Sequence, residues 1–331
     1  MIRHKRYSTS SIGAVWPPTF ATYNRLRGLY PESVDTRSQM SRFIQEFTYY
    51  REMAQLSSID RSTIRYVGST EFLHLLPESE IQIEGVIPLA CTHSHYLIYT
   101  RWNSPTRTAA TERVDRHRNL LEQTRSHQIR ANNIETVAES LGLRIQLLSR
   151  TTAPSRRASE IPRFSDIYRA FGRSEQDAAE LVLDVNNTIA YLVAPDGSIV
   201  CTTLVEQARI PIAGHGMLNL YEVAEGATRS DYQGRGLYRG LSAFLIDIIR
   251  DESSAPIDAI YGECNLSAPG VVYAARQNGR RFVYDDRHLY DMTQSSGPDF
   301  GILCQNYKVN DGEESWGYND FVLTYVDLAA R

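Results

Sequence analysis

Two glycines, Gly234 and Gly236, directly precede a run of residues with the apolar spacing of an amphipathic helix. Within residues 237–249, large apolar side chains recur every three or four positions and form one stripe. A strand that ends in such a turn and continues into a helix points free backbone N–H groups at one place, where the helix dipole adds positive potential. The missing Cβ atoms let an anion approach closely. The feature predicts an α/β unit with a phosphate-binding turn, and a plain flexible turn is the alternative.

The turn does not match the common nucleotide-binding motifs. A Walker A loop needs Gly-Lys-Ser/Thr, which does not follow these glycines. In a Gly-x-Gly-x-x-Gly fingerprint the third glycine would stand where this chain has Arg239, and Gly240 comes one residue late. The pattern therefore disfavours ATP and NAD as ligands.

The segments around the turn alternate between strand and helix patterns. Residues 188–194 and 198–208 read as two strands joined by a Pro-Asp-Gly turn, and residues 218–228 read as a third strand. Residues 151–163 are rich in proline, serine and arginine and predict a linker. We therefore predict an α/β (α+β) fold with a mixed twisted sheet flanked by helices in residues 151–331. Residues 1–150 are predicted to form an additional N-terminal α+β region of unknown role.

The residues from Asp231 to Gly236 resemble motif A of the GCN5-related N-acetyltransferase (GNAT) superfamily, whose pattern is Arg/Gln-x-x-Gly-x-Gly/Ala. The order of strands and helices after residue 140 is also similar to that superfamily. Asp231 departs from the pattern, and an aspartate cannot donate a hydrogen bond to a pyrophosphate. Residues 261–272 and 300–321 loosely resemble β-lysine N-acetyltransferases.

The resemblance implies a fold that binds acetyl-CoA as a co-substrate without a metal. The pantetheine would lie beside the third strand, the pyrophosphate would lie at the start of the helix, and a backbone N–H near Thr228 would donate to the acetyl oxygen. The residues assigned to cofactor binding are Ala227, Thr228, Gln233, Gly234, Arg235, Gly236, Leu237, Tyr238 and Asn265.

The implied activity is transfer of an acetyl group to the primary amine of a small amino-acid-like substrate by direct attack. Glu222 is the candidate base, expected to share a strand face with residues 224, 226 and 228, and an exposed strand glutamate is its alternative. Tyr273 is the candidate acid for the leaving thiolate, with core packing as the alternative. The candidate amine contacts are Glu263, Glu314 and Trp316. Rival functions are transfer of a longer acyl group and non-catalytic sensing of acetyl-CoA.

Composition and charge disfavour several other classes of function. The net charge is −4 and no basic run is present, which disfavours nucleic acid as a partner. No stretch has the length and hydropathy of a membrane span or a signal peptide, so we expect a cytoplasmic chain, with a homodimer left open. The four cysteines form no CxxC pair. Cys91, His93 and His95 could face one side of a strand, but no fourth ligand is evident, and we expect no metal.

Overall fold

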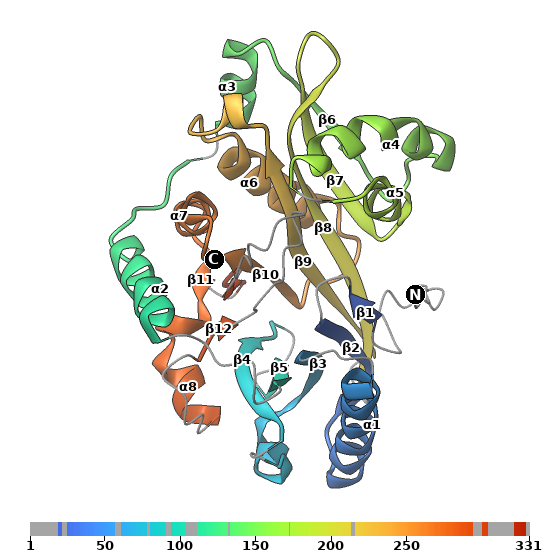
Figure 1. The fold of residues 1–331 in the computed structure, drawn as a ribbon, viewed down its shortest axis with the longest axis vertical. Helices are drawn as coiled ribbons and strands as arrows, with labels where there is room; N and C mark the ends of the chain where they lie inside the picture. The colour runs from blue at the N-terminus through green and yellow to red at the C-terminus, as the bar shows by residue number, and fades with distance from the viewer. Residues whose placement is uncertain are drawn as a thin grey trace.

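The computed structural model describes most of the 331-residue chain. The described residues are 19–21, 25–56, 61–77, 80–90, 94–103, 111–131, 133–171, 173–212, 216–293, 300–303 and 321–328. They form two β-sheets and eight α-helices, so the predicted α/β class with mixed sheets flanked by helices is confirmed (Figure 1).

The N-terminal part contributes a five-stranded sheet. Its strands are, in spatial order, β1 (Thr19–Ala21), β2 (Arg25–Val34), β3 (Arg61–Ser69), β5 (His95–Asn103) and β4 (Gln82–Pro88). The pair β2–β3 is parallel and the other pairs are antiparallel. Helix α1 (Arg37–Leu56) makes the crossover between the two parallel strands, and its apolar stripe packs on them.

The second sheet has eight strands. In spatial order they are β11 (Arg281–Phe282), β13 (Phe321–Tyr325), β10 (Ala259–Asn265), β9 (Gly216–Thr228), β8 (Ile199–Ile212), β7 (Asn187–Val193) and β6 (Arg144–Leu148), and β12 (Ile302–Leu303) also pairs with β13. The pair β9–β10 is parallel and the others are antiparallel. The predicted hairpin is present, because β7 and β8 are joined through Gly197 at φ 88°. β6 precedes residue 150 and yet belongs to this sheet, so a division of the chain by sheet falls between β5 and β6.

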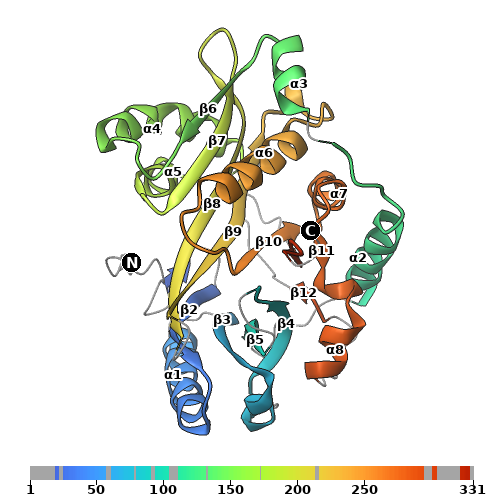
Figure 2. The same ribbon diagram turned by 180° about the vertical axis from the view of Figure 1, so that it is seen from behind.

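The remaining helices lie around this sheet. They are α2 (Thr111–Thr124), α3 (Ile134–Ser140), α4 (Pro154–Arg169), α5 (Glu175–Leu183), α6 (Leu237–Glu252), α7 (Pro269–Gln277) and α8 (Arg287–Thr293), with 3₁₀ turns η1 (Thr70–Leu75), η2 (Ser230–Tyr232) and η3 (Val283–Asp285). Helices α3 and α6 cover one face of β7–β10. Figures 1 and 2 show α6 on the side of the sheet away from α4 and α5.

The opposite face of the eight-stranded sheet has two different covers. Helices α4 and α5 pack over its upper part, around Leu204 and Ala227. The five-stranded sheet packs over the lower ends of the long strands β8 and β9, around Ile210 and Leu220, so the two sheets share one hydrophobic core. The junction between these two covers falls beside Glu222 of β9.

The predicted linker at residues 151–163 is wrong, because Pro154–Arg169 forms helix α4. Pro154 occupies the first turn, where its missing N–H costs nothing. The position that faces the core is Arg157, which is fully buried. Its guanidinium donates to the carbonyls of Ser149, Val182 and Asn187 at 2.7–2.8 Å. Because a charged residue occupies this buried position, the apolar periodicity of a helix is not evident in the sequence of the segment.

No helix among the described residues is long and apolar enough to cross a bilayer.

Replacing Arg157 with leucine should lower the free energy of unfolding by at least about 3 kcal/mol, because several buried carbonyls lose their donors. Urea denaturation measures the change. The adjacent Arg156 is exposed, and its replacement with leucine should have an effect of less than about 0.5 kcal/mol. Equal stability of the two variants would contradict the role given to Arg157.

Candidate functional site

Strands β9 and β10 run side by side for only four residue pairs. The last pair is Val223 with Gly262. Beyond it, β10 stays paired with β13 up to Asn265, whereas residues 224–228 of β9 pair only with β8 among the described strands. The backbone of β9 therefore presents an open edge toward β10 over these residues, which an extended ligand with amide groups can pair with.

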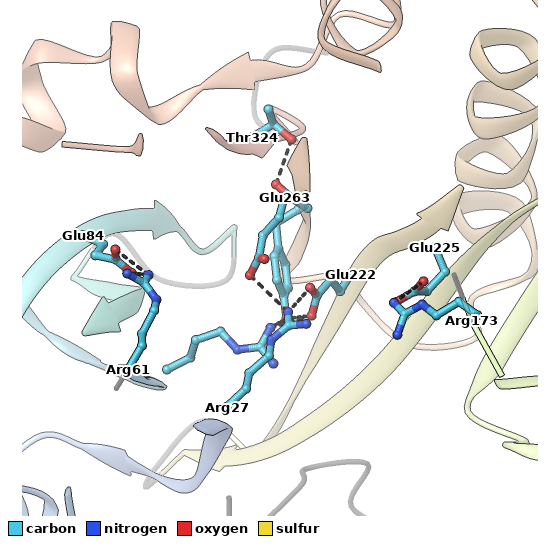
Figure 3. A network of polar contacts seen from close by, with 11 residues as sticks. Arg27, Arg61, Glu84, Arg173, Glu222, Glu225, Glu263 and Thr324 are labelled. Atoms are coloured by element: carbon cyan, nitrogen blue, oxygen red, sulfur yellow. Dashed lines mark hydrogen bonds and ion pairs between the residues drawn. The ribbon is translucent and has the colours of Figure 1, made fainter. Parts of the chain in front are cut away.

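A β-bulge lies within this open segment. Thr202 pairs with Ala227 and Leu204 with Ala224, so Glu225 and Gly226 share one opposing position on β8. Glu225 has φ 47°, the only positive value at a non-glycine residue among those described. Arg173 holds the Glu225 carboxylate at 2.6 and 2.7 Å (Figure 3). The ion pair fixes a backbone conformation that costs energy.

The bulge corrects the predicted strand faces. Alternation places residues 222, 224, 226 and 228 on one face, but the extra residue reverses the pattern after Ala224. Ala224 and Ala227 both pack toward α4 and α5. Thr228 lies on the α6 side, where its hydroxyl contacts the Sγ of Cys201 at 3.2 Å.

The turn after β9 has the conformation that the glycines predict. Gly234 and Gly236 have φ values of 76° and 74°, and Gly236 is the N-cap of α6. The first hydrogen bond of the helix runs from the N–H of Gly240 to the carbonyl of Gly236. The six N–H groups of residues 234–239 donate to no described residue, and they stand at the positive end of the helix dipole. A Cβ on Gly234 would meet nothing within 4 Å, so the approach to these groups is open.

The turn carries more positively than negatively charged side chains. Asp231 accepts two hydrogen bonds from Arg229, at 2.8 and 2.9 Å, and hydrogen bonding by Arg229 lowers the pKa of Asp231. Arg229 and Arg235 both lie over the ring of Tyr232. Arg235 donates to the backbone carbonyl of Asp231 at 3.3 Å, so two arginines lie beside one aspartate that is already paired. Arg239, at the start of α6, is directed at Ala131 and Asn133. Asp231, the departure from motif A, therefore orients Arg229 and leaves the turn cationic.

The other residues predicted to bind the cofactor border the same segment. The ring of Tyr238 lies against Gly226, where a Cβ would clash with it, and burial raises the pKa of Tyr238. Gln233 is exposed, and its side-chain amide donates to the carbonyl of Thr228 at 3.1 Å. Leu237 is the first residue of α6, and its side chain is buried. Asn265 ends β10, where its side chain accepts from the N–H of Ser267 at 2.8 Å.

Glu222 is buried at the junction between the two covers of the sheet. Its carboxylate pairs with Arg27 of β2 and Arg65 of β3, and Arg27 also reaches Glu263 at 3.1 Å (Figure 3). Tyr261 lies beside Glu222 at 3.5 Å. Burial alone would raise the pKa of Glu222, but the two guanidiniums outweigh it and lower the pKa from 4.5 to about 2. A carboxylate with this pKa is a weak base at neutral pH.

The structure therefore brings two of the predicted residues, Glu222 and Glu263, to one arginine. Tyr273 lies on α7 with its ring 4.7 Å from that of His127, so its described ring contact is with the segment that follows α2. Glu314 and Trp316 lie outside the described residues.

Sequence reasoning missed the arginines that complete the site. Arg27 and Arg65 stand 195 and 157 positions before Glu222, on strands of the other sheet. A signal was present in β3, where Arg61 and Arg65 interrupt a buried strand at a spacing that places them on one face. Arg61 pairs there with Glu84 at 2.7 Å (Figure 3). Charged residues inside a buried strand indicate buried partners.

The metal constellation that the sequence raised is only partly described. Cys91 and His93 lie outside the described residues. The Nε2 of His95 lies 2.9 Å from the carboxylate of Asp35.

No protein-family model matches the chain, and no curated protein sequence matches it. The chain is similar to the solved structure of Arabidopsis thaliana NAA60 in complex with acetyl-CoA, with 12% identity and a TM-score of 0.39 over 55% of this chain and 97% of that one. It is similar to the ribosomal-protein-S18-alanine N-acetyltransferase of Escherichia coli, with 16% identity and a TM-score of 0.38 over 56% and 92%.

A third similar structure is the aminoglycoside acetyltransferase meta-AAC0020 from an uncultured soil metagenomic sample, in complex with sisomicin. It has 11% identity and a TM-score of 0.33 over 43% of this chain and 89% of that one. Each TM-score lies below 0.5, so the function proposed below rests on the geometry of β9, β10 and α6.

Replacing Glu222 with glutamine should lower the free energy of unfolding at pH 7 by about 3 kcal/mol, because Arg27 and Arg65 lose their counter-charge. The pKa of Glu222 lies below its ordinary value, so this stabilisation is complete above the ordinary value of 4.5 and is lost as the pH falls toward 2. The gap between the two proteins should therefore close with acidification, as urea denaturation from pH 7 to pH 3 would measure.

Glu32 provides the control, because it pairs with Arg42 and its side chain is about half exposed. Its replacement with glutamine should change stability by less than about 1 kcal/mol at either pH. A Glu222→Gln variant as stable as the wild type at pH 7 would contradict the ion-pair arrangement.

Proposed function

We propose that the chain is an acyltransferase of the GNAT type that transfers an acetyl group from acetyl-CoA to the amine of a small amino-acid-like molecule. The observation that carries the proposal is the open edge of β9, which is followed by the six N–H groups of residues 234–239 that donate to no described residue. Both features occur where β9 and β10 separate after Val223 and Gly262. An extended amide chain that ends in a pyrophosphate, such as CoA, fits this arrangement.

Different segments of the chain would bind different parts of CoA. The backbone of residues 224–228 pairs with no described strand on the β10 side and would pair there with the pantetheine amides. Two of its carbonyls already accept a side-chain donor, that of Glu225 from Tyr168 and that of Thr228 from Gln233, both at 3.1 Å. The N–H groups of residues 234–239 would hold the pyrophosphate, and Arg229 and Arg235 add positive charge that Asp231 only partly offsets. CoA, when bound, supplies the acetyl group as a thioester that is reactive toward amines.

Direct attack by the amine is favoured over a covalent acyl-enzyme. Cys201 and Cys264 are the cysteines that the structure describes, and both are buried. Burial raises the pKa of Cys201 to about 12, so it is a thiol at neutral pH and a poor nucleophile.

The acceptor amine would approach at the junction between α4–α5 and the five-stranded sheet, on the face that carries Glu222 and Glu263. Because Glu222 has a pKa of about 2, we assign it to positioning Arg27 and Arg65 in place of proton abstraction. Glu263 shares Arg27 with it at 3.1 Å, and we assign Glu263 to contacting the amine. The likeness to β-lysine N-acetyltransferases remains a prediction about this acceptor.

Replacing Gly234 with valine should abolish measurable CoA binding, because the new side chain would stand over the free N–H groups. Its positive φ also adds a backbone cost of about 1–2 kcal/mol. Calorimetry with CoA measures the binding.

Gly216 is the matched control. It has φ 81° and, like Gly234, no neighbour within 4 Å of an added Cβ, but it stands at the far end of β9. Gly216→Val should pay a similar backbone cost and still bind CoA. Equal loss of binding in both variants would mean that general instability causes it. Normal binding by Gly234→Val would exclude the proposed cradle.

Two tyrosines are candidates for the proton donor to the leaving thiolate. Tyr273 is the residue that the family resemblance implies, and Tyr238 is the one whose ring lies against Gly226 in the open segment. We expect Tyr238→Phe to lower kcat by about 10²-fold with little change in KM, and Tyr273→Phe to stay within about 3-fold of the wild type. Thiol release from acetyl-CoA over a panel of amines measures both. The opposite order would assign the proton donor to Tyr273.

The sensor alternative predicts a different outcome in the same assay. Micromolar binding of acetyl-CoA with no thiol release from any amine would make the chain a binding module. Absence of CoA binding by the wild type would overturn the proposal.

A further inference from the structure

Arg280 differs from the other buried arginines of the described chain. Arg61 and Arg65 pair with carboxylates, and Arg157 donates to backbone carbonyls. Arg280 is 5% exposed, and its Nε and Nη2 are buried with no hydrogen-bond partner among the described residues. A buried guanidinium without an acceptor is costly, so its presence calls for an explanation.

The backbone holds Arg280 in one place. Helix α7 ends at Gln277, and Gly279, two residues later, has φ 73°. The N–H of Gly279 donates to the carbonyl of Arg276, and the N–H of Arg280 donates to that of Ala275, at 2.9 and 3.0 Å. These two bonds form a Schellman motif. The position is therefore built by the end of α7 and is independent of what the guanidinium binds.

The guanidinium lies at the last residue pair before β9 and β10 separate. Its Nη2 sits against Gly262, where any Cβ would clash with it and with the carbonyl of Val223. The carbonyl of Gly262 is already used, because Thr324 donates to it at 3.0 Å. Tyr238, whose ring covers the open segment of β9, is close enough for the charge of Arg280 to act on its pKa.

The acids of the site cannot serve as the partner of Arg280. Glu263 follows Gly262 on β10, so its side chain points to the opposite face of the sheet. There it binds Arg27, as does Glu222 from β9 (Figure 3). Cys264 and Cys201, near Tyr238 on the side of Arg280, offer only weak acceptors. A positive charge thus faces a largely apolar region at the inner end of the proposed acyl-CoA site.

We propose that Arg280 binds a carboxylate group of one of the two substrates at this point. The inference rests on the proposed function and narrows its substrates. A planar guanidinium matches a carboxylate through two parallel hydrogen bonds, and the apolar surroundings strengthen them. The carboxylate comes either from the acyl chain of a dicarboxylic thioester or from an amino-acid acceptor that reaches from the face of Glu222 through the gap between β9 and β10. A neutral analogue that leaves the guanidinium unpaired is rejected.

Two pairs of probes separate the sources of the carboxylate. For the donor, calorimetry compares succinyl-CoA with acetyl-CoA. For the acceptor, thiol release compares lysine with cadaverine, which carries the same amines without the carboxylate. We expect a preference of about 10- to 100-fold for the carboxylate-bearing member of one pair. Preference in neither pair would overturn the inference.

Replacing Arg280 with methionine provides the second test. The preference should fall to within about 3-fold, and Arg280→Lys should restore part of it. The melting temperature of the free Arg280→Met protein should equal or exceed that of the wild type, because an unpaired buried charge is replaced by an apolar side chain. A purely structural arginine would give the reverse, a lower melting temperature with the preference unchanged, and that result would overturn the inference.

The neighbouring Arg281 is the matched control. Its side chain is 56% exposed and pairs with Asp327 at 2.6 Å, so Arg281→Met should leave the preference unchanged. If the wild type binds no CoA at all, the proposed function fails. CoA binding without any preference between the probes refutes only the role of Arg280.

Discussion

The arrangement of this molecule depends on the point at which two parallel strands stop pairing. β9 and β10 are held together through Val223 and Gly262, and after that pair β10 continues with β13 alone. The separation leaves the backbone of residues 224–228 with donors and acceptors that no described strand uses on that side. An open edge of a sheet offers a row of backbone donors and acceptors with which an extended ligand can pair. The bulge at Glu225 and the turn at Gly234 then carry the chain from this edge into α6.

The two faces of the sheet give the separation point two different environments. On one face, Glu222 joins β9 to Arg27 and Arg65 of the five-stranded sheet, so the ion pairs connect the N-terminal region to the proposed acceptor side. On the other face, Tyr238 and Arg280 lie against the strands beneath α6 and α7. The N-terminal region therefore contributes to the hydrophobic core and supplies two arginines to the candidate site.

The sequence predicted the local parts of this arrangement. Gly234 and Gly236 have the positive φ that the turn requires, and Leu237 begins an amphipathic helix, because both signals depend only on neighbouring residues. The Pro-Asp-Gly turn between β7 and β8 was predicted for the same reason. The linker prediction failed since a buried arginine, Arg157, hides the apolar period of α4.

The non-local parts could not be read from the sequence. One extra residue at the bulge reverses the faces of Ala227 and Thr228, and nothing in the alternation of β9 announces it. The partners of Glu222 come from strands more than 150 positions away, and their charges turn a candidate base into a fixed carboxylate. The burial of Arg280 follows from the packing of α7 on β10, which only the assembled fold determines.

Hydrogen exchange of the backbone amides, measured by mass spectrometry with and without CoA, tests whether CoA binds along β9 and at the start of α6. We expect CoA to slow exchange in two segments, residues 224–228 and residues 234–239, while the hairpin turn at Gly197 is unchanged. Unchanged exchange in both segments at saturating CoA, or protection confined to another part of the chain, would contradict the account.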